Sequence, residues 1–337
     1  MAETAQALWY TGPGRSEIRN EALGPLAGGA LRIRATHGGI SRGTESLVAA
    51  GRVPASEHQR MRAPFMAGSF PFPVKYGYAT VGAVERGPSA LLGRNVFALY
   101  PHQTVFDLPA EAAVVVPDAV PPSRAVLAAN METALNAAWD AGPGPFGRAA
   151  VVGAGVIGIL TGYLCRKLLS ADVTLVDVNP AREATAAALG LRFALPGAAP
   201  TECDLVFHAS ASSAGLVTAL AAAAEEASII ELSWYGDALV SLPLGGAFHS
   251  RRLKLMASQV GKVAPSHRRE WTHHRRLQHA VGLLDDDRLD VLLEPAIAFE
   301  DLPQRLPSVL APGSAALCQC IDYRQPEEGA RVRRGSP

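Results

Sequence analysis

The sequence contains few cysteines, and Cys165, Cys203, Cys318 and Cys320 are all of them. They are too few and too scattered for a disulfide framework, which excludes a small fold held together by cross-links. The chain also lacks an excess of either charge, since 31 Lys and Arg residues balance 31 Asp and Glu residues. A balanced chain gives no electrostatic reason to bind nucleic acid or an anionic membrane surface.

Long apolar runs are absent as well. Gly, Ser or a charged residue interrupts every stretch of about 18 residues, the length that a membrane-spanning helix needs. The first residues, "MAETAQALWYTGPGR", include Glu3 and no apolar run, so we expect neither a secretion signal nor a membrane anchor there. Together these absences predict a cytoplasmic protein whose partner is a small molecule.

The residues that are present suit a large globular protein. The chain has 337 residues, of which 48% are apolar and 18% charged, enough for two domains with a substantial core. In roughly the first 120 residues, short apolar runs are broken by Gly and Pro, which predicts a β-rich domain. The expected strands there are 31–36, 79–85, 95–100 and 112–117.

The pattern changes between Pro121 and about Gly261, where short apolar runs alternate with alanine-rich segments. Such alternation predicts a doubly wound parallel sheet with helices on its faces. The expected strands are 149–154, 173–178, 203–209 and 227–233, and the expected helices are 158–170, 181–190 and 213–226. A helix over 266–284, a mixed segment over 289–306 and a strand over 316–323 complete the fold, followed by a polar tail that we expect to be frayed.

A glycine motif follows the first strand of that alternating region. The run "VVGAGVIG" contains the G-x-G-x-x-G pattern Gly153-Ala154-Gly155-Val156-Ile157-Gly158. Gly153 permits the tight turn, Gly155 permits close approach of a pyrophosphate, and Gly158 permits close packing of helix on strand. The free N–H groups at the start of the helix favour the negative phosphates. The motif therefore predicts a dinucleotide-binding site that includes Val156 and Ile157.

The next predicted strand ends in an acidic residue. Asp177 lies 24 residues after Gly153, where a carboxylate accepts hydrogen bonds from the adenosine ribose and repels a 2′-phosphate. The cofactor is therefore predicted to be NAD(H) rather than NADP(H). Arg182 lies near enough to flank the adenosine, although a solvated helix arginine explains it equally well.

Two further strand ends should face the nicotinamide, because ligands of such sheets bind beyond the carboxyl ends of the strands. These ends are "FHAS", residues 207–210, and "ELSWYG", residues 231–236. The side chains predicted to lie nearest to the nicotinamide are His208, Ser210, Ser233 and Trp234.

A β-rich first part, a mid-chain dinucleotide fold and a return to the first part resemble the medium-chain dehydrogenase/reductase superfamily, which includes the zinc-type alcohol dehydrogenases. The resemblance covers residues 7 to about 323 and is most specific at "GAGVIG…VDVN" and at "GGISRGTE". It implies an α/β fold in which a Rossmann doubly wound parallel sheet is inserted in a β-rich GroES-like catalytic domain.

The same resemblance implies a division of the chain and an assembly. Residues 1–125 would form the GroES-like catalytic domain, residues 126–262 the Rossmann domain, and residues 263–337 the return to the catalytic domain plus the tail. Thr133 would lie beneath the nicotinamide ring. The protein would be a homodimer joined at the edge of the Rossmann sheet, with residues 238–244 at or beside the joint.

The zinc ligands of that superfamily are missing. Zinc-bearing members take a Cys from the segment resembling "GGISRGTE", a His or Glu from a Gly-His-Glu triplet, and a later Cys or Glu. This sequence has Ser41-Arg42-Gly43, Gly77-Tyr78-Ala79 and Ala129 at those places, and it lacks the four-cysteine lobe that carries structural zinc. Since zinc requires Cys, His or carboxylate ligands, we predict no metal. The alternative is a rearranged site built from Glu45, His58, His102 or Glu132.

Without zinc, side chains must move the proton and stabilise the substrate oxygen. Tyr78 stands at a former ligand position, where Lys75 and the nicotinamide charge would lower its pKa from about 10. His102 is the second candidate for a proton relay. The residues predicted to orient the substrate oxygen are Ser41, Arg42, Thr44 and Glu45. Alternatively, Tyr78 fills the space left by the metal and His102 caps a strand end. Arg42 would then pair with Glu45.

The segment from residue 51 to 73 indicates the kind of substrate. It is rich in Arg, Met, Phe and Pro, so it offers an adaptable apolar surface on which Arg60 and Arg62 would meet carboxylates. A bulky or ring-bearing substrate fits such a surface, and an Ω-loop packed on its own body is the alternative. "GISRGTE", the missing metal and "VKYGY" most resemble the branch that contains 2-desacetyl-2-hydroxyethyl bacteriochlorophyllide dehydrogenase, which implies NAD-linked oxidation of a secondary alcohol to a ketone.

Two other functions stay open. The first is an NAD(P)H-dependent reductase of activated C=C bonds, of the quinone or enone type, because such enzymes of the superfamily also lack zinc. They usually take NADPH and carry basic or small residues where this chain has Asp177. The second is a non-catalytic dinucleotide-binding protein, because a fold alone does not establish an activity.

Overall fold

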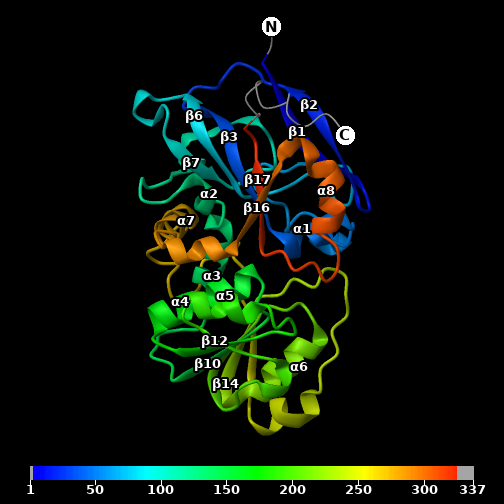
Figure 1. The fold of residues 1–337 in the computed structure, drawn as a ribbon, viewed down its shortest axis with the longest axis vertical. Coiled ribbons are helices and arrows are strands. Elements are labelled where there is room, and N and C mark those ends of the chain that lie inside the picture. The colour runs from blue at the N-terminus through cyan, green and yellow to red at the C-terminus, as the bar shows by residue number, and fades with distance from the viewer. Residues whose placement is uncertain (1–2, 325–337) are drawn as a thin grey trace, which may run out of the picture.

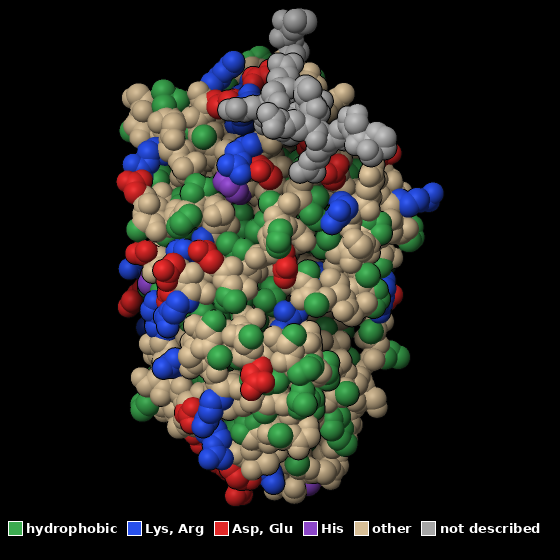
Figure 2. Space-filling model, viewed as in Figure 1, with side chains coloured by type: hydrophobic (Ala, Val, Ile, Leu, Met, Phe, Trp, Pro, Cys, Tyr) green, Lys and Arg blue, Asp and Glu red, His purple; other side chains and the backbone are tan. Residues whose placement is uncertain are grey.

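The computed structural model describes residues 3–324, which form two lobes (Figure 1). The upper lobe in Figure 1 combines the N-terminal strands with the last strands of the chain, and the lower lobe contains the middle of the chain. Basic and acidic side chains are interspersed over the face drawn in Figure 2. Within residues 3–324, the helices are too short or too polar to cross a bilayer. The expected frayed tail lies, from residue 325 on, outside the described residues.

The lower lobe, which we call the Rossmann lobe, is built on a six-stranded sheet with the order β12-β11-β10-β13-β14-β15. All neighbouring strands in this sheet are parallel. This is the order of doubly wound dinucleotide-binding folds, so the predicted fold class is confirmed. The strands are β10 (Arg148–Val152), β11 (Asp172–Val176), β12 (Arg192–Ala194), β13 (Cys203–His208), β14 (Ala223–Glu231) and β15 (Lys254–Ala257).

Three helices connect these strands: α4 (Val156–Leu169), α5 (Arg182–Ala188) and α6 (Ser213–Ala222). The central strand β10 is buried from Ala149 to Val152, because helices cover both faces of a parallel sheet. That burial explains why its sequence is a continuous apolar run rather than an alternating one.

The upper lobe, which we call the catalytic lobe after the catalytic domain that the resemblance leads us to expect, contains two sheets with mostly antiparallel pairing. One has the order β16-β17-β3-β6-β7-β9 with β8 beside β3, and the other has the order β2-β1-β5-β4. The strands are β1 (Thr4–Gly12), β2 (Arg15–Ala22), β3 (Ala30–Ile40), β4 (Ala67–Gly68), β5 (Val74–Lys75), β6 (Thr80–Arg86), β7 (Asn95–Ala98), β8 (Val105–Pro109), β9 (Ala113–Val115), β16 (Leu293–Ala298) and β17 (Cys318–Asp322). Its helices are α1 (Arg42–Ala49), α2 (Pro122–Ala125) and α8 (Leu302–Val309). Antiparallel pairing of β17 with β3 returns the chain to this lobe, as expected.

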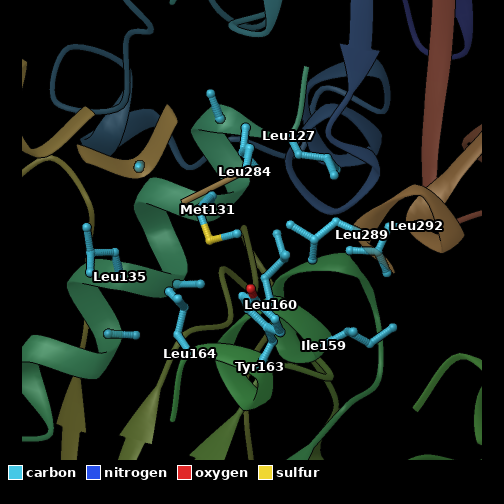
Figure 3. Close-up of a cluster of buried hydrophobic side chains, with 14 of the residues drawn as sticks. Leu127, Met131, Leu135, Ile159, Leu160, Tyr163, Leu164, Leu284, Leu289 and Leu292 are labelled. Carbon is cyan, nitrogen blue, oxygen red and sulfur yellow. The ribbon is translucent and has the colours of Figure 1, made fainter. Parts of the chain in front are cut away.

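The two lobes share an apolar core around α3 (Ala128–Asp140) and α7 (His273–Gly282). Figure 3 shows Met131 of α3 close to Leu160 of α4 and to Leu284, which follows α7. Burial of this many apolar side chains joins the lobes through a continuous hydrophobic contact.

Two predicted helices end differently in the structure. The helix predicted over 213–226 stops at Ala222, because Ala223 already pairs with Cys203 in the sheet. The helix predicted over 266–284 begins at His273, because Thr272 caps it by accepting a hydrogen bond from the N–H of Arg275. Alanine content and apolar spacing overestimated both helices because neither signal marks the cap.

Candidate functional site

The glycine loop between β10 and α4 has the three environments that dinucleotide binding requires. Gly153 has φ of 106°, and a Cβ there would lie 2.6 Å from the backbone nitrogen of Ser210. A Cβ on Gly158 would lie 1.8 Å from the carbonyl oxygen of Gly153. A Cβ on Gly155, by contrast, would meet nothing within 4 Å. Two glycines are therefore required by packing, and the third faces open space at the N-terminus of α4, where Val156 and Ile157 are partly exposed.

Asp177 is held beside this loop. Its Oδ2 accepts a hydrogen bond of 2.6 Å from the N–H of Ala154, and its Oδ1 accepts one of 2.8 Å from the N–H of Asn179. Each carboxylate oxygen keeps further acceptor capacity, and the residue is only partly buried. The structure thus places Asp177 where the sequence predicted it, and the residues fit a dinucleotide whose adenosine ribose bonds to this carboxylate.

Two arginines from different lobes lie near each other beyond the glycine loop. Arg182 donates a hydrogen bond to the carbonyl oxygen of Ala315, so it links the lobes instead of standing free in solvent. Burial, together with the charge of Arg182, lowers the pKa of Arg42. Arg42 forms no ion pair within the described part of the chain, so the alternative in which it pairs with Glu45 is wrong. The two guanidinium groups therefore bring positive charge from both lobes to one region.

The predicted nicotinamide-facing residues lie at the ends of β13 and β14. His208 is fully buried and contacts Ser210, while Ser233 accepts a hydrogen bond from the N–H of Ala211. Trp234 packs against the core of the catalytic lobe, and the neighbouring Asp237 forms a 2.8 Å ion pair with Arg52 of that lobe. The loop after β14 therefore bridges the two lobes.

Thr133 on α3 is partly exposed, and its hydroxyl donates to the carbonyl oxygen of Ala129 at 3.0 Å. The hydroxyl proton is therefore used in a bond within α3. The role of Thr133 beneath the nicotinamide ring stays a prediction.

The hydroxyl groups of Tyr78, Ser41 and Thr44 lie together near the positions where the resemblance places zinc ligands. Burial raises the pKa of Tyr78 to about 12, while the side chains of Ser41 and Thr44 partly offset the rise. The expected lowering by Lys75 is wrong, because the Lys75 ammonium donates to Glu21 at 2.6 Å and to Gln103 at 2.7 Å instead. Tyr78 therefore stays protonated at neutral pH and is a hydrogen-bond donor.

His102 and Glu45 form a buried pair behind these hydroxyls. Glu45 Oε2 lies 2.9 Å from His102 Nε2 and accepts a 2.9 Å hydrogen bond from the Tyr10 hydroxyl. Glu45 Oε1 accepts the N–H of Ser41 at 2.9 Å, which fixes the start of α1. Both His102 and Glu45 have no exposed surface, and a Cβ on Gly77 would touch the His102 ring at 2.9 Å. These two residues support the site from behind, because Gly77 and the Ser41 turn cover them.

The side chains at the former zinc positions do not suit zinc, because Tyr78, Ser41 and Ala129 offer no Cys, His or carboxylate. Across residues 3–324, no three His, Cys, Asp or Glu side chains gather in a way that could hold a metal ion. Of the four residues of the alternative site, only Glu45 and His102 lie together, and the other two are engaged elsewhere. Glu132 pairs with Arg276 at 3.0 Å, and His58 Nε2 bonds to the carbonyl oxygen of Val53.

The segment from residue 51 to 73 packs on its own lobe. Met66 and Phe70 are buried in the catalytic core. Arg62 donates to the carbonyl oxygens of Gly68 and Met66, so its guanidinium braces the segment. Arg60 is exposed, and its Nε lies 3.9 Å from Oε2 of Glu57. The alternative of a loop packed on its own body is therefore favoured over a wide substrate surface, and a role for Arg60 stays a prediction.

Sequence reasoning missed Glu231, Tyr235 and Gly215, which surround His208 and Ser210. Glu231 is the last residue of β14 and lies beside His208 at the end of β13. A polar residue at the carboxyl end of a parallel strand is a sequence signal that could have identified it. Tyr10 was also missed, since it reaches Glu45 from a strand 35 residues away in sequence.

Known proteins share this fold without close sequence similarity. No family model and no curated protein match the sequence. L-idonate 5-dehydrogenase from Escherichia coli is 16% identical over 96% of this chain and 99% of its own, with a TM-score of 0.78. A structure named short chain alcohol dehydrogenase from E. coli CFT073, complexed with NADH, is 15% identical over 95% and 99%, with a TM-score of 0.75. A dehydrogenase from Sinorhizobium meliloti bound to NADP is 17% identical over 95% and 99%, with a TM-score of 0.74. The chain thus has the fold of these dehydrogenases, a Rossmann domain with a GroES-like domain.

Proposed function

We propose that the protein is an NAD(H)-dependent oxidoreductase that interconverts a secondary alcohol and a ketone on a bulky or ring-bearing small molecule, without catalytic zinc. The observation that carries the proposal is the glycine loop, in which Gly155 faces open space while Asp177 is fixed beside it. The fold shared with dehydrogenases supports the redox class. The resemblance of "GISRGTE" and "VKYGY" supports the substrate class.

When bound, the nicotinamide cofactor would supply the hydride chemistry. Gly153, Gly155 and the N-terminus of α4 would hold its diphosphate, and Asp177 would hold its adenosine ribose. Arg42 and Arg182 supply positive charge from the two lobes.

The residues of this chain suggest how the substrate oxygen is handled. Because the pKa of Tyr78 is raised, its hydroxyl is a donor that would stabilise a ketone oxygen and transfer a proton to the forming alcohol. Ser41 and Thr44 orient that hydroxyl. Glu45 fixes the Ser41 turn, and His102 in turn holds Glu45. We propose Tyr78 as the catalytic residue and Glu45 and His102 as positioning residues.

Zinc independence has a direct test. The purified protein is expected to contain less than one zinc per ten chains by elemental analysis, roughly the level of adventitious metal, and to keep its turnover in a chelator, because Ser41, Tyr78 and Ala129 are unsuited to zinc. One tightly held zinc per chain, removed together with the activity, would refute this part of the proposal.

The enone reductase is the second candidate, because a tyrosine donor would serve an enone oxygen as well as a ketone. Asp177 disfavours it through the expected discrimination against NADPH. A screen of secondary alcohols and enones with both cofactors separates the two. Turnover of enones alone would favour the reductase, and cofactor binding without any turnover would favour a non-catalytic protein.

We propose that the protein is a homodimer joined at the free edge of the Rossmann sheet. Strand β15 ends that sheet, and Leu255 and Met256 on it are partly exposed. The adjacent segment 238–244 exposes Leu239 to 99%. An apolar edge strand is a template for pairing with a second copy. A monomeric mass by light scattering at micromolar concentration would refute the dimer.

A further inference from the structure

A polar network lies at the carboxyl ends of β13 and β14. His208 Nδ1 is 2.8 Å from Glu231 Oε2, and its Nε2 is 2.6 Å from Ser210 Oγ. Glu231 also accepts hydrogen bonds from the N–H of Ser233 at 2.7 Å and from the Tyr235 hydroxyl at 3.0 Å. The buried imidazole thus has a carboxylate on one nitrogen and a serine hydroxyl on the other.

The protonation of this network follows from its partners. Burial raises the pKa of Glu231, but hydrogen bonds from His208 and Ser233 leave this pKa below its ordinary value. Glu231 is therefore ionised at neutral pH. A carboxylate has no proton to donate, so the hydrogen bond with Nδ1 requires a proton on that nitrogen. In the neutral imidazole Nε2 is then an acceptor, and Ser210 donates its hydroxyl proton to it.

The Ser210 oxygen is consequently left as an acceptor. Ser212 Oγ lies 3.0 Å away and accepts the N–H of Gly215, so its own proton is free for Ser210. Ser210 is partly exposed, and one lone pair of its hydroxyl oxygen remains. Diphosphate oxygens have no proton to offer to it, whereas ribose hydroxyls do.

The packing around the network is fitted to this arrangement. A Cβ on Gly215 would lie 2.1 Å from Ser210 Oγ and 2.9 Å from His208 Nε2. Gly215 lies within α6, where glycine is an unfavourable residue, so the space that it leaves explains its presence. Ser210 is also adjacent to the glycine loop, because its nitrogen would lie 2.6 Å from a Cβ on Gly153.

The topology places Ser210 on the nicotinamide side of that loop. Strand β11, which precedes Asp177, lies on one side of β10, and β13, which precedes Ser210, lies on the other. A dinucleotide with its adenosine ribose at Asp177 and its diphosphate on the loop extends its second ribose towards β13.

We propose that His208 and Glu231 are positioning residues that hold Ser210 as an acceptor for a hydroxyl of the nicotinamide-side ribose. The inference rests on the proposed function, because it requires the dinucleotide site. It assigns to Glu231, which is bonded to His208, control over the direction of the Ser210 hydrogen bond.

Titration calorimetry with three probes tests the contact. NAD and ADP-ribose both carry the second ribose, and ADP lacks it. Ser210→Ala is expected to weaken NAD and ADP-ribose by about 3- to 10-fold, the effect of one lost hydrogen bond, and to leave ADP unchanged. Ser250→Ala is the matched control, because this exposed hydroxyl of the same lobe donates only to the Gly246 carbonyl, and it should weaken none of the probes.

Glu231→Gln tests the positioning role separately. The amide has the shape of the carboxylate but presents an N–H to His208, which reverses the tautomer and turns Ser210 from acceptor to donor. Long-range ¹H–¹⁵N NMR should find Nε2 of His208 unprotonated in the unmodified protein and protonated in Glu231→Gln. The variant should weaken ADP-ribose less than Ser210→Ala does, because a ribose hydroxyl can also accept a hydrogen bond from Ser210.

The outcomes separate the inference from the function on which it rests. Unchanged ADP-ribose affinity in Ser210→Ala, or an equal loss for ADP, overturns the inference and leaves the dinucleotide site standing. A protonated Nε2 in the unmodified protein overturns it as well. If none of the three probes binds the unmodified protein, the proposed function itself is refuted.

Discussion

The two lobes arrange their polar residues in opposite ways. In the Rossmann lobe, Asp177 and Ser210 stand partly exposed at strand ends beside Gly155, which faces open space. In the catalytic lobe, Glu45 and His102 are fully buried and bonded to each other. In the proposed function, cofactor recognition would depend on backbone geometry and strand ends, whereas the substrate chemistry would depend on side chains held in place by a buried network.

The largest expected effect tests the catalytic lobe. Tyr78→Phe should lower turnover by about 10²- to 10⁴-fold, because it removes the donor to the substrate oxygen, and should leave NAD affinity nearly unchanged. Steady-state kinetics with the alcohol or ketone found in the screen measure the loss. Tyr100→Phe is the matched control, the same change in the same lobe at a tyrosine stacked on Phe106. Full turnover in Tyr78→Phe would make this tyrosine a space-filling residue.

The next effect tests the Rossmann lobe by packing. Gly158→Ala should destabilise the protein by about 3 kcal/mol and abolish measurable NAD binding, because its Cβ would lie 1.8 Å from a backbone oxygen. Gly155→Ala is the control, since its Cβ meets nothing within 4 Å and should leave the thermal unfolding temperature unchanged. It should still weaken NAD binding, because the Cβ would occupy the path of the diphosphate. Unchanged binding in Gly155→Ala would move the cofactor away from this loop.

A smaller expected effect is a difference between the two lobes in how much stability each loses at high pH. Burial raises the pKa of five tyrosines in the catalytic lobe, Tyr10, Tyr76, Tyr78, Tyr100 and Tyr323, and of only two in the Rossmann lobe, Tyr163 and Tyr235. In the unfolded chain these groups lose protons near pH 10, and in the folded chain they do so only at higher pH. Stability is therefore full below pH 10 and falls as the pH rises above it. Hydrogen exchange followed by mass spectrometry should show the catalytic lobe opening before the Rossmann lobe, and simultaneous opening would contradict this.

The same contrast explains what could be predicted from sequence. The spacing of Gly153, Gly155 and Gly158 and the position of Asp177 are local features, so the turn and the carboxylate beside it could be predicted from the sequence. Lys75 was misplaced because its partners, Glu21 and Gln103, are 54 and 28 residues away in sequence. No pattern along the chain reports such pairs.

Other parts of the candidate site failed for a related reason. Arg62 was predicted to bind substrate, but the carbonyl oxygens of its own segment occupy it, and carbonyl groups leave no sequence signal. Glu45 and His102 were predicted as site residues, and their role stays a prediction. Their burial behind Gly77, which makes them supporting residues, depends on tertiary packing alone.

The most direct test of the account is calorimetric titration of the metal-free protein with NAD and NADP. Asp177 is fixed by two backbone N–H groups, so its carboxylate should repel the 2′-phosphate of NADP. We expect one NAD site per chain. The affinity for NAD should be at least about tenfold higher than for NADP, a difference of roughly 1.4 kcal/mol in binding free energy. This difference should become smaller in Asp177→Ala. Equal affinities in the unmodified protein, or no binding without added zinc, would contradict the account.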